Sequence, residues 1–191
     1  MSDPNLGEGV YRKLHGSERE AFRDHLLRLD AESRRLRFGH PVPDSFVRQY
    51  AEHTPWTGCV IHGFFSDDAL RGTAELRPFG NLIPDKAEAA FSVEKPWQGK
   101  GIGKELLRRL VLSARNRGIK ELTMYWLPEN NRMRALAQQG NAQIAWDAGE
   151  VTGTVTPPSP TGLSFLREVF EDLSSVGGTV WDGQKRLLHL G

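Results

Sequence analysis

The sequence contains one cysteine, no long apolar run and almost no net charge, and each absence excludes a class of protein. With Cys59 alone, the chain cannot form an internal disulfide or a multi-cysteine metal site. No stretch approaches the roughly 20 apolar residues of a membrane-spanning helix, and the first residues lack the basic start and apolar run of a signal peptide. These features predict a cytoplasmic protein with no membrane partner and no metal site.

Length and composition are those of a folded domain. The 191 residues are 38% hydrophobic and 26% charged, which is ordinary for a globular protein with one sizeable core. The net charge of +1 argues against nucleic acid as a partner. The charges are unevenly placed, because residues 95–120 contain eight basic residues and one acidic residue. We therefore expect a ligand with several negative charges at this segment.

The apolar periodicity predicts strands and helices that are interleaved along the chain. Strands are expected at residues 10–14, 58–65, 69–79, 88–93, 121–127, 142–146 and 151–156. Helices are expected from Ser17, with Glu20 completing a capping box, after Asp44, and over residues 101–117 and 130–139. Residues 34–41 are expected to form a loop. Antiparallel strand pairs followed by strands separated by helices indicate a mixed α/β sheet.

Residues 157–191 are expected to form an extension of a domain that spans residues 1–156. Residues 157–162 are rich in proline and predict a stiff linker. Beyond the linker, apolar residues recur at helical spacing and predict an amphipathic helix: Leu163, Leu166, Val169, Phe170 and Leu173. We expect this helix to pack on the same domain or on a second copy of the chain, forming a homodimer.

The segment from Ala87 to Lys104 carries the chemistry, because there a strand runs into a glycine-rich turn that opens a basic helix. Glycines let the backbone approach a ligand closely, and a helix N-terminus presents unpaired N–H groups. This combination is typical of a phosphate-binding loop. A Walker A loop is excluded because Glu105 stands where Ser or Thr is needed, and the glycine spacing does not fit a dinucleotide fingerprint.

The run Gln98-Gly99-Lys100-Gly101-Ile102-Gly103 matches the pattern Gln/Arg-x-x-Gly-x-Gly/Ala of the GNAT N-acetyltransferases. Residues 127–141 resemble the last helix beside the cofactor in that superfamily, so that the resemblance covers about residues 8–156. Residues 32–38 and 87–103 are also similar to the catalytic domains of bacterial protein lysine acetyltransferases. The resemblance implies the GNAT fold, whose mixed, mostly antiparallel central sheet is flanked by helices.

The same resemblance implies acetyl-CoA as co-substrate and a set of residues that bind it. Backbone N–H groups of residues 98–103 would hold its pyrophosphate, and the strand before them its pantetheine arm. The cofactor-binding residues expected on this basis are Ser92, Val93, Glu94, Gln98, Gly99, Lys100, Gly101, Ile102, Gly103, Lys104 and Asn130. Asn130 is equally well explained as the cap of its helix.

Acetyl transfer to an amine needs a neutral nitrogen, and free amines are mostly protonated at pH 7, so a general base is expected. Glu88 is the candidate catalytic residue, since it lies on the strand before the loop, where the family often keeps a glutamate. Glu75 on the preceding strand is the reserve candidate.

The acceptor and the general acid stay open. The acceptor is a primary amine: a protein lysine, an N-terminus or a small amine. Ala137 matches the position at which the family often places the tyrosine that reprotonates the departing thiolate. The missing tyrosine supports a second hypothesis, a non-catalytic acyl-CoA-binding or sensing module.

Overall fold

The computed structural model describes residues 9–80, 84–147 and 149–187. Residues 1–8, 81–83 and 148 of the predicted domain and residues 188–191 of the predicted extension therefore lie outside the described residues. The elements follow one another as β1 (Val10–Lys13), η1 (Gly16–Glu18), α1 (Arg19–Arg28), α2 (Ala31–Phe38), α3 (Asp44–Glu52), β2 (Val60–Ser66), β3 (Ala69–Pro78), β4 (Lys86–Val93), η2 (Lys95–Trp97), α4 (Ile102–Asn116), β5 (Glu121–Trp126), α5 (Asn131–Gln139), β6 (Gln143–Asp147), β7 (Glu150–Val155) and α6 (Gly162–Leu187).

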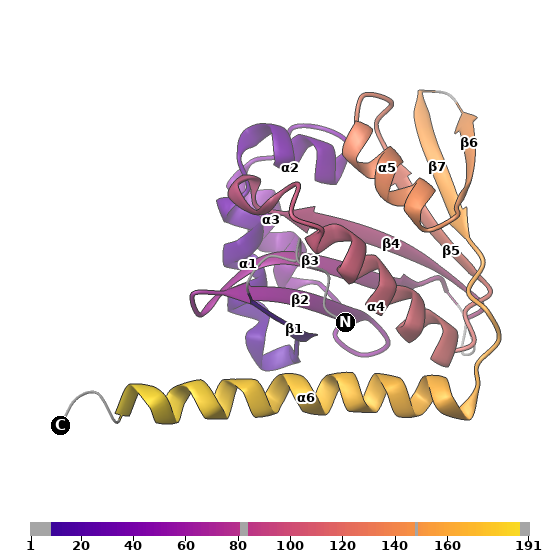
Figure 1. Cartoon of the computed structure of the whole chain (residues 1–191). Helices are drawn as coiled ribbons and strands as arrows, with labels where there is room; N and C mark the ends of the chain where they lie inside the picture. Colours follow the sequence, from indigo (N-terminus) through magenta and orange to yellow (C-terminus); the bar gives the residue numbers. More distant parts are fainter. Residues whose placement is uncertain (1–8, 81–83, 148, 188–191) are drawn as a thin grey trace.

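All the strands belong to one sheet of order β1-β2-β3-β4-β5-β7-β6 (Figure 1). Neighbouring strands are antiparallel except β4 and β5, which are parallel. The prediction of a mixed, mostly antiparallel sheet is therefore confirmed. The parallel pair is short, because only residues 86–88 of β4 are in register with residues 121–123 of β5. Further along, β5 pairs with β7 alone, and the two parallel strands separate.

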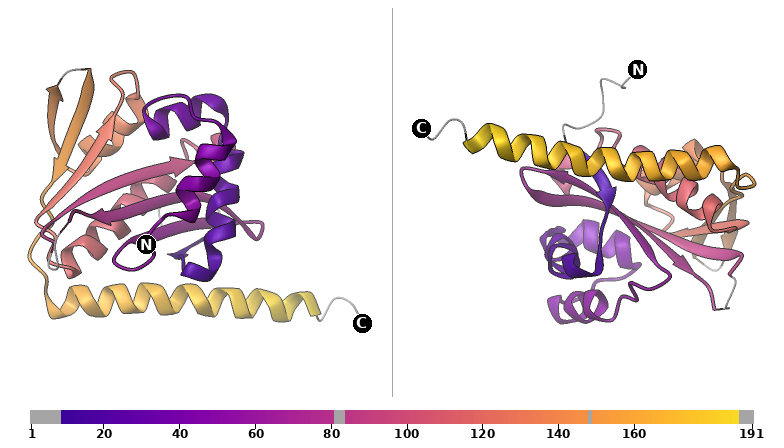
Figure 2. Two further views of the ribbon diagram at one scale, coloured as in Figure 1. Left: turned by 180° about the vertical axis from the view of Figure 1, so that it is seen from behind. Right: turned by 90° about the horizontal axis from the view of Figure 1, so that it is seen from below.

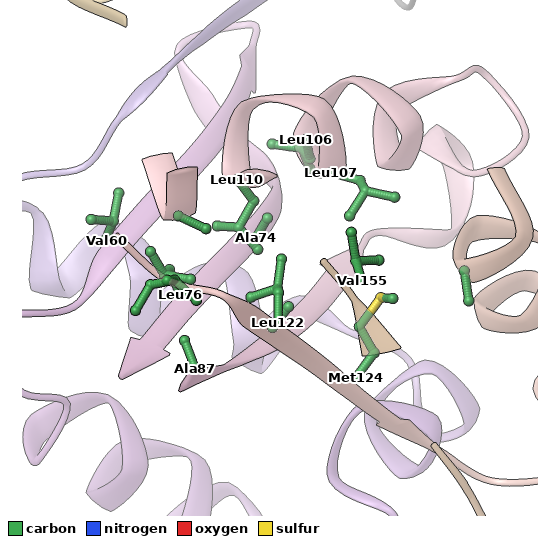
Figure 3. Close-up of a cluster of buried hydrophobic side chains, with 14 of the residues drawn as sticks. Val60, Ala74, Leu76, Ala87, Leu106, Leu107, Leu110, Leu122, Met124 and Val155 are labelled. Carbon is green, nitrogen blue, oxygen red and sulfur yellow. The ribbon is translucent and has the colours of Figure 1, made fainter. Parts of the chain in front are cut away.

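Helices cover both faces of the sheet (Figures 1 and 2). On one face, α4 buries an apolar stripe that includes Leu106 and Leu110, and these side chains meet Leu76 and Leu122 of the sheet (Figure 3). On the other face, α1 and α3 form a second apolar cluster with β2 and β3. Burial of these two clusters from water is the main source of stability for the layers.

Two local predictions near the N-terminus are wrong. Residues 31–38 form α2 instead of part of a loop, because Asp30 accepts a hydrogen bond from the Ser33 N–H at 2.9 Å and Gly39 ends the helix with a left-handed φ of 79°. The expected capping box at Ser17 is also absent. A 3₁₀ turn precedes α1, and Glu18 accepts a hydrogen bond from the His15 N–H at 3.0 Å.

The C-terminal helix α6 forms as predicted, but it packs on the domain with its polar face. Ser164 and Glu168 are buried against α4 and β1, whereas the apolar stripe predicted to pack is exposed. Glu168 accepts hydrogen bonds from Lys13 at 2.6 Å and from Ser113 at 2.7 Å. Burial alone would raise the pKa of Glu168, but its hydrogen bonds, first of all with Lys13, outweigh this and lower the pKa to about 2. In the described ranges, no helix is long and apolar enough to cross a membrane.

We predict that Glu168→Ala detaches α6 from the domain, because it leaves the buried donors of Lys13 and Ser113 without this acceptor. The free energy of unfolding should fall by roughly 1–3 kcal/mol, and the α6 amides should exchange with deuterium much faster. The control Arg167→Ala removes a side chain that is 62% exposed and should cost less than about 1 kcal/mol. Equal amide exchange in Glu168→Ala and Arg167→Ala would contradict this attachment.

The stabilisation by Glu168 should also depend on pH. Since the pKa of Glu168 is depressed in the folded chain, its contribution to the free energy of unfolding is present above pH 4.5 and is lost as the pH falls towards 2.

Candidate active site

A cleft of about 500 Å³ opens where β4 leaves β5. Its walls come from α2, the end of β4, the glycine loop (residues 98–103), the start of α4 and one side of α5. Figure 1 shows α2 and α5 on either side of this end of β4. The cleft therefore joins segments from both faces of the sheet at the point where the sheet is divided.

The glycine loop presents backbone N–H groups to this cleft. Gly99 and Gly101 have φ of 75° and 76°, a left-handed conformation that other residues adopt only at a cost. The first backbone bond of α4 runs from the Glu105 N–H to the Gly101 carbonyl at 3.2 Å. The preceding N–H groups, of residues 102–104, thus have no carbonyl acceptor within the helix. Nine of the eleven residues expected to bind the ligand line the cleft: Ser92, Val93, Gln98, Gly99, Gly101, Ile102, Gly103, Lys104 and Asn130.

Gln98 ties the loop to the end of β4 rather than offering its own N–H to a ligand. Its backbone N–H is directed to the Lys95 carbonyl at 3.3 Å, and its side-chain Nε2 donates to the Val93 carbonyl at 2.8 Å. The Gln98 side chain also lies 3.3 Å from Ser33 Oγ of α2. This residue therefore holds together three walls of the cleft.

The edge of β4 that faces the opening can be identified from its hydrogen bonds. The Glu94 N–H donates to the Arg71 carbonyl at 2.9 Å, on the β3 side. Successive residues of a strand turn their N–H and C=O groups to opposite edges. The polar backbone groups of Val93 and Phe91 consequently face the opening, where β5 no longer pairs with them. Those of Ser92 and Glu94 face β3, so these two predicted cofactor contacts do not present their backbone to the cleft.

Ser92, which lines the cleft, belongs through its side chain to a buried polar network. His25 of α1 is fully buried, with Nε2 at 2.9 Å from Ser92 Oγ and Nδ1 at 3.2 Å from Glu94 Oε1. Because the Glu94 carboxylate only accepts, Nδ1 carries the proton, and Nε2 accepts from the Ser92 hydroxyl. Ser92 Oγ then accepts from Thr73 at 2.8 Å. The network fixes β4 to α1 and β3.

The charge of Glu94 is balanced within this network. Arg28 and Arg71 donate to its carboxylate at 2.9 and 3.1 Å. Burial would raise the pKa of Glu94, but the hydrogen bond with His25 and the charge of Arg28 lower it. Burial conversely lowers the pKa of His25 and keeps the imidazole neutral. Glu94 thus positions β4 and is not among the residues that line the cleft.

Glu88 lies at the last residue pair between β4 and β5, opposite Thr123, at the closed end of the opening. Ala89 belongs to the α4-side cluster, and Phe91 and Val93 pack against it. Strand alternation therefore turns Glu88, like Ser92, to the α1–α3 face. Its side chain is half-buried and does not line the cleft itself.

Glu75, the reserve candidate, is engaged by other side chains. It is 1% exposed, and Arg37 and Arg77 each donate to it at 2.6 Å, while the Tyr50 hydroxyl donates at 3.0 Å. Burial would raise the pKa of Glu75, but the charges of Arg37 and Arg77 lower it. A carboxylate bound in this way is a poor proton acceptor, so Glu88 is the better placed of the two.

The basic segment 95–120 is only partly available to a ligand. Lys104 lines the cleft, whereas the Lys100 ammonium lies 4.7 Å from the centre of the Trp97 ring. Arg108 and Arg109 each donate to Glu105 at 2.8 Å. The net charge of this segment therefore overstates the positive charge at the cleft.

The cleft also contains residues that were not among the predicted cofactor-binding residues. They are Ser33, Leu36 and Arg37 of α2 and Arg132, Met133 and Leu136 of α5. The α2 residues were missed because that segment was expected to be a loop. Their signal was local: Asp30, three residues before Ser33, and Gly39 together mark the two ends of a short helix.

Asn130 caps α5 and also lines the cleft, so its cap is confirmed and its contact with the cofactor stays a prediction. Its side-chain oxygen accepts from the Met133 N–H at 3.1 Å. Ala137 is fully buried near Gly153, on the core side of α5. Among the described residues that line the cleft there is no tyrosine.

Comparison with known proteins identifies a family. Residues 23–141 match the model of the acetyltransferase (GNAT) family. A curated relative, the acetyltransferase Pat of Mycolicibacterium smegmatis, is 31% identical over 88 residues, which are 46% of this chain and 26% of the relative. The chain thus spans about a quarter of that relative's length.

Solved structures show the same fold. The GNAT domain of S. lividans PAT has a TM-score of 0.67 at 22% identity and covers 76% of this chain and 89% of its own. A Salmonella typhimurium acetyltransferase solved with its cofactor acetyl-CoA has a TM-score of 0.59 at 15% identity, with coverage of 82% and 98%.

We predict that His25 makes stability depend on pH. Its pKa in the folded chain lies below its usual 6.5, so the unfolded chain binds a proton that the folded chain does not, and stability is lost as the pH falls below 6.5. Relative to wild type, His25→Gln should reduce the slope of unfolding free energy against pH just below 6.5 by up to about 1.4 kcal/mol per pH unit.

Chemical denaturation at a series of pH values measures this slope. His62→Gln should reduce it in the same way, since burial lowers the pKa of His62 to about 3. A slope that becomes steeper in His25→Gln would mean that a protonated His25 stabilises the fold, contrary to the network described above.

Proposed function

Because the chain belongs to the acetyltransferase (GNAT) family, we propose that it binds acetyl-CoA in the cleft and transfers the acetyl group directly to a primary amine. The acceptor is a protein lysine, an N-terminus or a small amine. The observation that carries the proposal is the junction of a glycine loop, a helix N-terminus and a divided sheet in one cleft. The reaction proceeds through one ternary complex, since both substrates meet at the opening.

The parts of the cleft suit the parts of acetyl-CoA. The free N–H groups at the start of α4 donate hydrogen bonds to the pyrophosphate, with Lys104 nearby. The open backbone edge of β4 supplies strand-like hydrogen bonds to the amide groups of the pantetheine arm, as an added strand would receive them. This places the thioester between β4 and β5, close to the Val93 N–H, which stabilises the oxyanion of the tetrahedral intermediate.

Glu88 acts as the general base. Its side chain lies on the α1–α3 face, whereas α4 begins on the other face, so the amine and the thioester approach the opening from opposite sides. The amine nitrogen attacks the thioester carbon, its surplus proton passes to Glu88 directly or through water, and the carbon–sulfur bond then breaks. In the absence of a cleft tyrosine among the described residues, water protonates the departing thiolate.

The missing tyrosine also favours a second candidate function, an acyl-CoA-binding module without turnover. Both candidates bind acetyl-CoA at the same loop. They differ in whether acetyl reaches any member of a panel of protein, peptide and small amines.

We predict that Gly101→Asp weakens acetyl-CoA binding at least 100-fold, measured by calorimetry, because it puts a carboxylate beside the pyrophosphate. Gly101→Asn is the matched control, since asparagine has the same shape without charge and tolerates the φ of 76°. Binding should rank wild type, then Asn, then Asp. Gly103→Ala should bind like wild type, because a Cβ there meets only Leu136 methyl groups at 3.8 Å. Wild-type affinity in Gly101→Asp would refute the loop assignment.

We predict that Glu88→Gln lowers kcat by roughly 10²–10⁴-fold, the usual contribution of a general base, while acetyl-CoA affinity stays unchanged. Steady-state kinetics on an acceptor found in the panel measures this. Glu121→Gln is the matched control, because it removes an equal charge on the adjacent strand, where Glu121 pairs with Lys86 at the surface. If Glu88→Gln keeps full kcat, the base lies elsewhere. If wild type binds acetyl-CoA and acetylates no amine, the binding module is the correct function.

A further inference from the structure

Helix α6 is attached to the domain by polar contacts, which fix the direction of its apolar face. Glu168 is 8% exposed and bonds to Lys13, Ser113 and Asn116. Ser164 is 4% exposed and is also hydrogen-bonded to Asn116, at 2.5 Å. Since these buried groups would lose their partners if the helix turned, the opposite face is held towards solvent.

That opposite face carries the α6 stripe, which consists of Leu163, Leu166, Val169, Phe170 and Leu173. Each of these side chains is between 55% and 80% exposed. Together they expose on the order of 600 Å² of apolar surface, which is at the upper end for a single patch on a monomeric protein. A patch of this size and continuity indicates an interface.

The spacing of the stripe suits packing against another helix. Leu163, Leu166, Phe170 and Leu173 are separated by three, four and three residues, which places them in one row along α6. A row of this kind can pack along the matching row of a partner helix.

We propose that this partner is α6 of a second copy, so that the protein is a homodimer about a two-fold axis. The same stripe on each copy is self-complementary, as a two-fold interface requires. Its area approaches the ~800 Å² that each partner contributes to a standard stable interface.

A membrane surface is the less suitable occupant. Amphipathic helices that lie on membranes are rich in Lys and Arg on their polar face. Residues 162–174 contain one basic residue, Arg167, and three acidic residues, Glu168, Glu171 and Asp172. This segment thus lacks the cluster of basic residues with which such helices bind anionic lipids.

The dimer leaves the cleft accessible. Figures 1 and 2 show α6 along the edge of the domain remote from α2 and α5, with its last turns extending past β1. Each copy therefore keeps its own site, and the oligomeric state can be tested independently of acetyl transfer.

The test is the molar mass of the full chain by sedimentation equilibrium at micromolar concentration. Wild type should be a dimer. The double variant Leu166→Glu, Phe170→Glu should be a monomer with the wild-type circular dichroism spectrum, because both side chains are exposed in one copy. Gln49→Glu, which adds one negative charge at an exposed position of α3, should remain a dimer. Phe170→Ala is a milder variant, which should raise the dimer dissociation constant at least tenfold.

Three results would overturn the proposal. One is a monomeric wild type over the whole concentration range. Another is a double variant or Phe170→Ala that dimerises as tightly as wild type. The third is a monomer that floats with phosphatidylglycerol vesicles and loses this binding in the double variant, which would assign the α6 stripe to a lipid surface.

Discussion

The separation of β4 from β5 after Glu88 is the constraint on which the site depends. Within a sheet, backbone N–H and C=O groups are normally paired, and leaving them without partners is costly once water is excluded. Here one parallel pair ends after three residues, and the edge of β4 at Phe91 and Val93 is left without a neighbouring strand among the described residues, with only the Val93 carbonyl taken up, by Gln98 Nε2. A ligand that brings amide groups and a polyphosphate can complete both this edge and the start of α4. The candidate site thus combines a gap in a hydrogen-bonded sheet with the cleft beside it.

Three buried carboxylates attach helices to the rest of the domain. Glu75 binds Arg37 of α2, Glu94 binds His25 and Arg28 of α1, and Glu168 attaches α6 to β1 and α4. Each carboxylate keeps its charge because opposite charges and hydrogen-bond donors outweigh the cost of burial. Such contacts require defined directions, which apolar packing alone does not. These polar contacts help to fix the orientation of α1, α2 and α6 on the domain.

Local signals predicted some elements well and others poorly. Helix α4 was evident because its apolar stripe runs for four turns and follows an unmistakable glycine loop. Helix α2 was missed because Arg34, Arg35 and Arg37 dilute its apolar periodicity, although Asp30 and Gly39 mark its ends. The apolar stripe of α6 was recognised, but the helix packs on the domain with its polar face instead. Periodicity shows that one face of a helix is apolar. It does not show that the opposite face will bind a distant residue, as Glu168 binds Lys13, 155 residues away in the sequence.

The sequence by itself determined the glycine loop, the strands, most of the helices and the resemblance to one family, because all of these depend on residues close together in the chain. Only the tertiary structure decided which of these residues face the cleft. Strand pairing directs the backbone groups of Ser92 and Glu94 towards β3. Glu105 accepts hydrogen bonds from Arg108 and Arg109, and Glu75 accepts them from two arginines. Orientation and charge balance arise from contacts between distant segments, so they could not be obtained from local patterns.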